Sequence, residues 1–238
     1  MSSDDHARVG DRNTGVALGA NINQQITIYN LNTLPNLPPT ELRSQIGDKR
    51  LVGELVQMLA RNNSFCHNVH RPLESGFHVT DYIDLRILAM DGLIANAFGR
   101  AVVTLIDPPA FDMLVGLDPI ALAVSASASN LTDKPCSYFL SFSTKPRVIE
   151  NKVPKAFGTR LILLSDVVAT TETIRVAVKS LQSRGFSIRG VVAIVVRGGL
   201  PSPQLPDLNI EFRWVLAYPF QNHPPNKCPA CVEGKVFM

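Results

Sequence analysis

The sequence predicts an α/β fold in which helices cover both faces of a parallel sheet. The strands expected at residues 160–165 and 188–196 are apolar almost throughout, which is typical of strands buried on both faces. Segments with helical periodicity alternate with these strands, as in parallel α/β sheets. A length of 238 residues, of which 45% are apolar, is enough for one substantial core.

The first 39 residues differ in composition from the rest, being rich in Asn, Gln, Gly and Thr and ending in a Pro-rich break. Ile22, Ile26 and Ile28 are spaced by polar residues, which predicts an exposed β-ribbon. Asn/Gln-rich strands can ladder between chains, and a ribbon can extend a partner's sheet. We therefore expect residues 1–39 to be a β-prone arm for homo-oligomer assembly or partner docking; the plain alternative is a mobile tail.

Residues 40–205 form the expected sheet domain. We expect, in order, a helix at 41–61 capped by Thr40, a strand or hairpin at 78–88, a helix at 91–106 capped by Asp91, and a strand at 111–117. There follow a helix at 119–131 begun by Pro119, strands at 136–143 and 160–165, a helix at 173–184 ended by Gly185, and a strand at 188–196. Residues 206–238 form a C-terminal segment with one more strand, at 210–220, and a pair of cysteines.

Composition limits the partners. The net charge of +3 is mild and the basic residues are scattered, so we expect nucleic acid to be involved only indirectly. The apolar run at 191–196 is far shorter than the roughly 20 residues that cross a bilayer. The polar, acidic start is unlike a secretory signal, and the four cysteines lack disulfide-framework spacing. We expect a cytoplasmic protein without membrane contact.

The stretch "RLILLSDVVATTETI" (160–174) reads as a buried strand, a hydroxyl-rich turn and the start of a helix. Hydroxyls and backbone N–H groups at a helix N-terminus are the usual cradle for a phosphate. An ionised Glu172 in that cradle would repel an anion by about 4 kcal/mol at ~4 Å and an effective dielectric near 20, unless its side chain turns to solvent. The plain alternative is an ordinary helix cap, in which the polar side chains of the turn satisfy unpaired N–H groups. The candidate ligand-binding residues are Ser165, Asp166, Ala169, Thr170, Thr171, Glu172 and Thr173.

This stretch resembles the phosphoribosyl-pyrophosphate signature of type I phosphoribosyltransferases. The segment "LESGFHVTDYIDLR" (73–86) is similar to the substrate segment of orotate phosphoribosyltransferases, and 112–116 and Arg197-Gly198 resemble further family elements in the family's order. The resemblance implies the family's sheet, and Mg²⁺ wherever a phosphoribosyl ligand binds. It also implies that Asp166 is a catalytic residue, the second of the paired acids that hold the ribose hydroxyls. It also implies a substrate segment that includes Tyr82, Asp84 and Arg86.

The sequence departs from the family at the positions that bind the negatively charged phosphates of the substrate and leaving group. Ser165 replaces the first of two acids, and Thr171 and Glu172 replace small residues of the loop. Asp118 and Pro119 stand where a pyrophosphate loop needs amide donors, and the stretch 139–147 keeps only part of a basic loop. The leading hypothesis is therefore a degenerate phosphoribosyltransferase, acting as a ligand-binding, scaffolding or regulatory subunit of an oligomeric assembly. The arm loosely resembles terminal segments of bacterial conflict proteins, which suggests antiviral defence or toxin control.

The alternative is an active enzyme that acts on a ribose-phosphate or nucleotide substrate with Mg²⁺. In this hypothesis Asp166, Thr170 and Thr173 hold the ribose phosphate, while Glu172 or Asp118 serves as metal ligand or base. The sequence leaves open whether the protein is an enzyme.

Two smaller motifs each allow two interpretations. Asp84 and Arg86 either form a buried ion pair that fixes a hairpin, which we favour, or recognise a nucleobase. Cys228 and Cys231 have the spacing of half a structural zinc site, for which the remaining ligands would come from Cys66, His70 or His223. The alternative for this Cys pair is two reduced thiols.

Overall fold

The computed structural model describes residues 24–25, 42–73, 76–139, 158–197, 205, 208–218 and 221–237. Its main sheet has seven strands in the order β1-β2-β11-β10-β9-β7-β8. These strands are β1 (Gln24–Gln25), β2 (Arg43–Ser44), β7 (Met113–Gly116), β8 (Cys136–Tyr138), β9 (Arg160–Val168), β10 (Ser187–Arg197) and β11 (Glu211–Tyr218).

Strands β8, β7, β9, β10 and β11 run parallel, while β2 pairs antiparallel with β11 and β1 antiparallel with β2. In chain order the parallel strands therefore lie 2-1-3-4-5, one of the two common doubly wound arrangements. The order reverses between β7 and β9, and ligands of such sheets bind beyond the carboxyl ends of the strands at that point.

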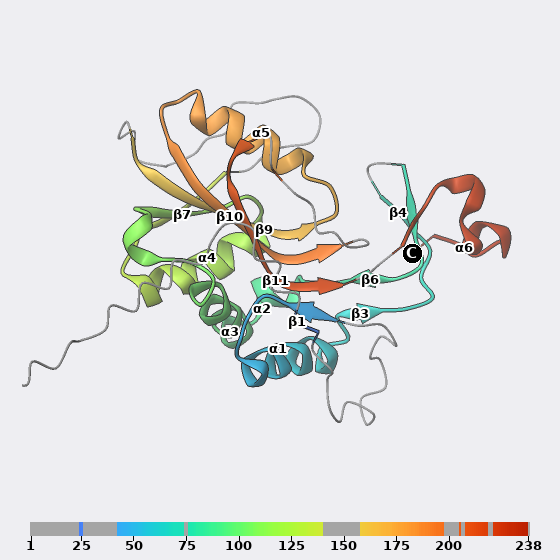
Figure 1. Cartoon of the computed structure of the whole chain (residues 1–238). Coiled ribbons are helices and arrows are strands. Elements are labelled where there is room, and N and C mark those ends of the chain that lie inside the picture. The colour runs from blue at the N-terminus through green and yellow to red at the C-terminus, as the bar shows by residue number, and fades with distance from the viewer. Residues whose placement is uncertain are drawn as a thin grey trace, which may run out of the picture.

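Helices cover both faces of the sheet, as the sequence predicted (Figure 1). One core joins α1, α3 and α4 to strand residues such as Ile162 and Leu164, and the other joins α5 to Leu161 and Leu163. This alternation along β9 is the period-2 pattern of a strand buried on both faces. The helices are α1 (Lys49–Arg61), α2 (Ile87–Met90), α3 (Gly92–Val103), α4 (Pro119–Thr132) and α5 (Glu172–Gln182), with a short 3-10 turn η1 (Pro108–Ala110).

A small lobe lies beyond the carboxyl edge of the sheet, where the arrowheads of β10 and β11 point towards it (Figure 1). We define the small lobe as the antiparallel sheet β12-β5-β4 together with η3 and α6. The separate pair β3–β6 runs between the main sheet and this lobe. Their bounds are β3 (Phe65–Cys66), β4 (Arg71–Pro72), β5 (His78–Val79), β6 (Tyr82–Ile83), β12 (Asn222–His223), η3 (Pro225–Lys227) and α6 (Pro229–Val232).

The first helix begins later than predicted. Helix α1 starts at Lys49 because the Asp48 carboxylate accepts hydrogen bonds from the N–H groups of Arg50 (2.9 Å) and Leu51 (3.1 Å). The preceding residues 43–44 belong to β2 instead. Thr40, the predicted cap, lies outside the described residues.

The later predicted helices are confirmed. Asp91 caps α3 through the N–H groups of Leu93 and Ile94, and Pro119 is the first residue of α4. Helix α5 spans Glu172–Gln182, and Gly185 follows it with a φ of 88°. Among the strands, β9 continues to Val168, so Asp166 lies within the strand rather than in the turn after it.

Both ends of the chain contribute to the main sheet. Strand β11 pairs with β10 and β2, so residues 211–218 are part of the sheet. Of residues 1–39, the structure describes only Gln24–Gln25, which pair with Arg43–Ser44 at the sheet edge. The predicted ribbon positions Ile22, Ile26 and Ile28 lie outside the described residues.

No helix in the described parts of the chain combines the length and the apolar character needed to cross a membrane.

Candidate functional site

Two aspartates meet at the carboxyl ends of β7 and β9. The strand register pairs Gly116 with Leu164, so residues two further along each strand, Asp118 and Asp166, come opposite each other. The Asp166 N–H donates to Asp118 Oδ2 at 3.0 Å. Asp118 Oδ1 accepts from the Ala121 N–H at 2.6 Å, which caps α4.

This proximity and partial burial keep the two carboxyl groups protonated to a higher pH than usual. Burial first, and then the neighbouring charge of Asp166, raise the pKa of Asp118 from 3.8 to about 7. Burial also raises the pKa of Asp166, against the N–H donor of Val167, which lies 2.5 Å from Asp166 Oδ1. Below about pH 7 Asp118 therefore keeps its proton, and the pair carries less than the full charge of two ionised carboxylates.

The predicted phosphate cradle, residues 169–173, consists of a short loop at 169–171 and the first two residues of α5. Thr171 precedes the helix with φ −92° and ψ 6° and makes no capping hydrogen bond with its side chain. Its hydroxyl instead accepts from Arg175 Nε at 2.9 Å. Thr170 and Thr173 are exposed, Ala169 and Thr171 are half-buried, and Ser165 is buried.

The loop does not use the left-handed backbone that the glycines of such loops adopt. Among the described residues, the non-glycine positions with positive φ are Asn63, Asn68, Asp133 and Asn209, none of which lies in the loop. Thr171, with a φ of −92°, therefore carries no strain from a left-handed backbone. Glu172 is exposed, which is the solvent-facing arrangement that spares an anion most of its repulsion.

The substrate segment forms an ion pair as predicted, although the pair is not buried. Arg86 donates to both carboxylate oxygens of Asp84, and its side chain is 75% exposed. The pair is open to solvent because Asp84 and Arg86 lie in the turn that leads into α2 rather than inside a hairpin. Nearby, the guanidinium of Arg71 lies over the Tyr82 ring at 4.2 Å. Burial raises the pKa of Tyr82, and the Arg71 charge partly offsets this rise.

Arg197 links the carboxyl end of β10 to the small lobe. Its side chain is buried, and its Nη2 donates to Asn222 Oδ1 at 2.7 Å. Burial lowers the pKa of this guanidinium. The contact joins the sheet edge that carries Asp166 to strand β12.

The carboxylate pair does not fit a directly coordinated Mg²⁺. Three of its four oxygens already accept backbone N–H groups, from Ala121, Asp166 and Val167. Asp118 also keeps a proton up to about pH 7, and a cation bound between the two carboxyls would have to displace it. We therefore derive no step through a metal at these two residues.

The predicted Cys pair lies in the small lobe. His70, His78, Cys228 and Cys231 place their ligand atoms within 4.8 Å of one another. His70 was among the predicted partners, whereas Cys66 and His223 are not in this group. Cys66 lies on β3 and pairs with Tyr82, and His223 lies opposite His78 in the pairing of β12 with β5.

The structure gives Asp118 and His78 neighbours that the sequence did not predict. Asp118 was considered a metal ligand or base, and its pairing with Asp166 follows only from the strand order. His78 was not assigned to a metal site from the sequence, because it lies in the stretch that resembles a family motif. Its position eight residues after His70 was the sequence feature that could have indicated a second histidine ligand.

The curated proteins that match this chain in sequence are orotate phosphoribosyltransferases. No family model matches the chain. The orotate phosphoribosyltransferase of Thermus thermophilus is 26% identical over 165 residues, which cover 69% of this chain and 88% of that protein.

Solved structures give the same fold. The orotate phosphoribosyltransferase from Aeropyrum pernix matches with a TM-score of 0.59 at 20% identity, over 68% of this chain and 92% of that chain. Leishmania donovani UMP synthase matches with a TM-score of 0.55 at 27% identity over 69% of this chain. The match covers 35% of UMP synthase, so this chain corresponds to about a third of that protein. The chain is therefore similar in sequence to orotate phosphoribosyltransferases and shares the fold of type I phosphoribosyltransferases.

Proposed function

We propose that this protein binds a 5′-phosphoribosyl ligand as a degenerate phosphoribosyltransferase and has lost the transfer reaction. It acts as a ligand-binding or regulatory subunit. The observation that carries the proposal is the position of Asp118, whose carboxylate accepts the N–H groups of Ala121 and Asp166.

In a phosphoribosyl transfer reaction, backbone N–H groups at this position would hydrogen-bond to the anionic leaving group. Pyrophosphate carries several negative charges, and its departure is favoured by amide and cationic groups aimed at it. Here the Asp118 carboxylate takes one donor at the start of α4 and one in β9, and whenever it is ionised it adds a charge of the same sign as the leaving group. Both effects weaken stabilisation of the transition state.

The phosphate-binding half of the site remains usable. The first turn of the 11-residue helix α5 has no side-chain cap from Thr171. The hydroxyls of Thr170 and Thr173 are exposed beside it, and Glu172 is exposed as well. A 5′-phosphate at this position would accept the N–H groups of the first turn and gain from the helix dipole. Asp166 would face the ribose.

Calorimetric titration tests this binding. Ribose 5-phosphate, nucleoside monophosphates and phosphoribosyl pyrophosphate are titrated with and without Mg²⁺. Thr173→Val should weaken ribose 5-phosphate binding about five- to tenfold, since one hydrogen bond is worth about 1 kcal/mol. Ser183→Ala, at the opposite end of α5, is the matched control and should bind like the wild type. If none of these compounds binds, the proposal fails.

A second candidate is an active enzyme with altered chemistry, favoured by the raised pKa of Asp118, about 7. A carboxylate with such a pKa is suited to take a proton near neutral pH. Turnover of a phosphoribosyl compound that is lost in both Asp118→Asn and Asp166→Asn would support this candidate over the degenerate subunit.

We further propose that residues 1–39 serve assembly with a second copy or a partner protein, in a bacterial defence or toxin-control setting. Support comes from the pairing of Gln24–Gln25 with β2 at the edge of the main sheet. Deletion of residues 1–39 should lower the number of chains in the assembly measured by native mass spectrometry, and an unchanged number of chains would refute the role of the arm.

A further inference from the structure

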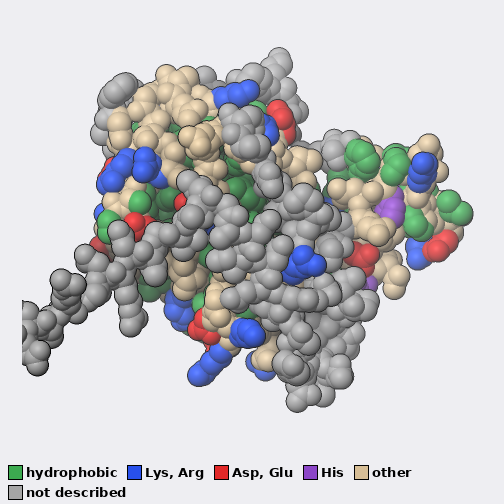
Figure 2. Space-filling model, in the orientation of Figure 1, with side chains coloured by type: hydrophobic (Ala, Val, Ile, Leu, Met, Phe, Trp, Pro, Cys, Tyr) green, Lys and Arg blue, Asp and Glu red, His purple; other side chains and the backbone are tan. Residues whose placement is uncertain are grey.

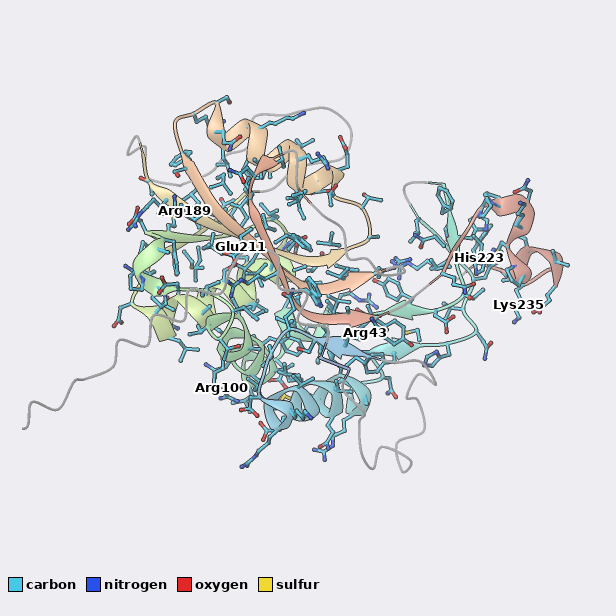
Figure 3. The ribbon with its side chains drawn as sticks, viewed as in Figure 1. Arg43, Arg100, Arg189, Glu211, His223 and Lys235 are labelled. Carbon is cyan, nitrogen blue, oxygen red and sulfur yellow. The ribbon has the colours of Figure 1, made fainter. Side chains whose placement is uncertain are left out.

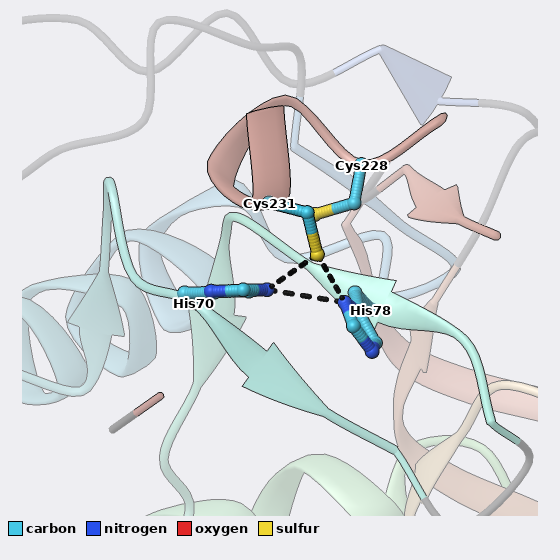
Figure 4. Close-up of side chains that lie close together, drawn as sticks. All are labelled: His70, His78, Cys228 and Cys231. Carbon is cyan, nitrogen blue, oxygen red and sulfur yellow. Dashed lines mark hydrogen bonds between the residues drawn. The ribbon is translucent and has the colours of Figure 1, made fainter. Parts of the chain in front are cut away.

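We propose that His70, His78, Cys228 and Cys231 hold a Zn²⁺ ion that fastens the C-terminal tail to the β4–β5 hairpin. The four side chains converge from two segments far apart in the sequence (Figure 4). His70 precedes β4 and His78 lies on β5, while Cys228 directly precedes α6 and Cys231 lies within it. The inference does not depend on what the carboxyl edge of the main sheet binds.

The spacing of the ligand atoms suits a tetrahedral zinc ion. His70 Nε2 lies 3.1 Å from His78 Nδ1, and Cys231 Sγ lies 3.2 Å from each of these two nitrogens. Bonds of about 2.0–2.3 Å in a tetrahedral site separate neighbouring ligand atoms by about 3.3–3.8 Å. An outward shift of a few tenths of an ångström would admit the ion.

Hydrogen bonds alone satisfy these atoms poorly. His70 Nδ1 lies 2.7 Å from the carbonyl oxygen of Lys235, so this nitrogen carries the proton and donates it. His70 Nε2 is then left with a single lone pair, towards which both His78 Nδ1 and Cys231 Sγ are directed. The carbonyl also plays the part that outer partners play around metal-bound histidines, since it selects the tautomer and orients the ring.

The surroundings match a closed structural site. His70 is 3%, His78 8% and Cys228 0% exposed, and the Phe237 ring packs against both imidazoles at 4.3 and 5.3 Å. Histidine (purple) appears in this lobe between hydrophobic groups on the face shown in Figure 2. Two thiolates and two imidazoles in tetrahedral array favour Zn²⁺ over Mg²⁺ or Ca²⁺, which prefer oxygen ligands.

The ion would stabilise the lobe that faces the carboxyl edge. Figure 3 shows that the lobe, with His223 and Lys235, projects away from the main body, where Arg100, Arg189 and Glu211 lie. In the lobe, β12 pairs with β5 and also carries Asn222, which accepts from Arg197 at the end of β10. A metal that holds α6 on the hairpin therefore also limits movement of the contact between the lobe and the main sheet.

Metal analysis of the full-length protein, purified under reducing conditions without chelator, tests the proposal. We expect one zinc per chain. After removal of zinc, titration with Co²⁺ alone should give the intense visible bands of tetrahedral cobalt and a thiolate charge-transfer band. The double variant Cys228→Ser/Cys231→Ser should lose the metal, whereas Cys66→Ser/Cys136→Ser and His223→Ala should retain it as matched controls.

Thiol labelling of the wild type avoids any dependence on whether the variants fold. Alkylation followed by mass spectrometry should modify Cys228 and Cys231 about tenfold more slowly with zinc than after chelation, because ligation removes the thiolate from reaction. Cys66 and Cys136 should react at rates that zinc does not change. Absence of zinc from the reduced protein, equal labelling with and without zinc, or a disulfide joining Cys228 to Cys231 in place of metal would overturn the proposal.

Discussion

Asp118 and Asp166 lie opposite each other at the carboxyl ends of β7 and β9, where the N–H of Asp166 donates to Asp118 Oδ2 at 3.0 Å. Asp118 also accepts the Ala121 N–H, so one side chain of the protein takes two donors that face the switch point of the sheet. This arrangement gives the proposed loss of the family's reaction a physical cause: the place where an anion would need donors already holds a carboxyl group.

The Asp118–Asp166 pair makes stability depend on pH. The folded-state pKa of Asp118, about 7, is above its ordinary value of 3.8, so between these values the folded protein keeps a proton that the unfolded chain releases. The free energy of unfolding should therefore fall as the pH rises from about 4 to 7, by up to about 4 kcal/mol. Asp118→Asn should remove most of this slope in urea unfolding measured across that range.

Asp112→Asn is the matched control for the pH experiment. The hydrogen bonds from Arg160 lower the pKa of Asp112 to about 2, so its contribution is present above its ordinary pKa and is lost as the pH falls towards 2. This variant should lower the free energy of unfolding by a constant amount between pH 4 and 7, so the slope in that range should stay the same as in the wild type. A slope between pH 4 and 7 that is the same in the wild type and in Asp118→Asn would show that the pair is not protonated as described.

Glu172→Gln should strengthen the binding of ribose 5-phosphate about two- to fivefold, because a like charge leaves the first turn of α5 while exposure already screens it. The gain should shrink at high salt. Glu54→Gln makes the same charge change on α1, where Glu54 pairs with Arg50, and should leave affinity unchanged. Calorimetry at two salt concentrations measures the affinity of both variants for ribose 5-phosphate. Equal gains in affinity for both variants would mean that the phosphate does not bind at the first turn of α5.

Gly116→Ala should lower the free energy of unfolding by about 2–4 kcal/mol. A Cβ at Gly116 would lie 2.5 Å from the backbone nitrogen of Leu122, so α4 would have to move away from β7. Gly53→Ala is the control, because it lies within α1 with nothing within 4 Å of its Cβ. That variant should gain about 0.5–1 kcal/mol from helix propensity. Similar urea midpoints for the two variants would contradict the close approach of α4.

Asn222→Ala should lower the free energy of unfolding by about 1–3 kcal/mol, because the buried Arg197 loses a hydrogen-bond acceptor. Asn226→Ala changes an exposed asparagine of the same lobe and should have little effect. Urea unfolding compares the two variants. A loss of similar size in both would mean that the Arg197–Asn222 contact does not hold the lobe to the sheet.

The order of the elements could be predicted because each strand and helix carries its own signal. Apolar runs such as 188–196 define strands buried on both faces, and Asp91, Pro119 and Gly185 mark helix ends through local backbone chemistry. The start of α1 could not be predicted as reliably, because residues 43–44 have no strand pattern until β11 lies beside them.

The site was harder to predict because its contacts join segments distant in the sequence. Asp118 was recognised beside Pro119, yet its pairing with Asp166 requires β7 and β9 to be neighbours in register. Likewise, Cys228 and Cys231 were recognised as half of a metal site, but His78 joins them only when the hairpin brings β5 under α6. The local sequence pattern can therefore predict a helix or strand, whereas these two clusters form only when distant strands and helices pack together.

Phosphorus NMR of the purified protein with phosphoribosyl pyrophosphate, Mg²⁺ and a panel of nucleobases that includes orotate tests the central claim most directly. If the protein is a degenerate member of its family, the 5′-phosphate signal should change on binding, and no pyrophosphate should form above the protein-free control. Pyrophosphate release that accompanies nucleotide formation and disappears in Asp166→Asn would contradict this account.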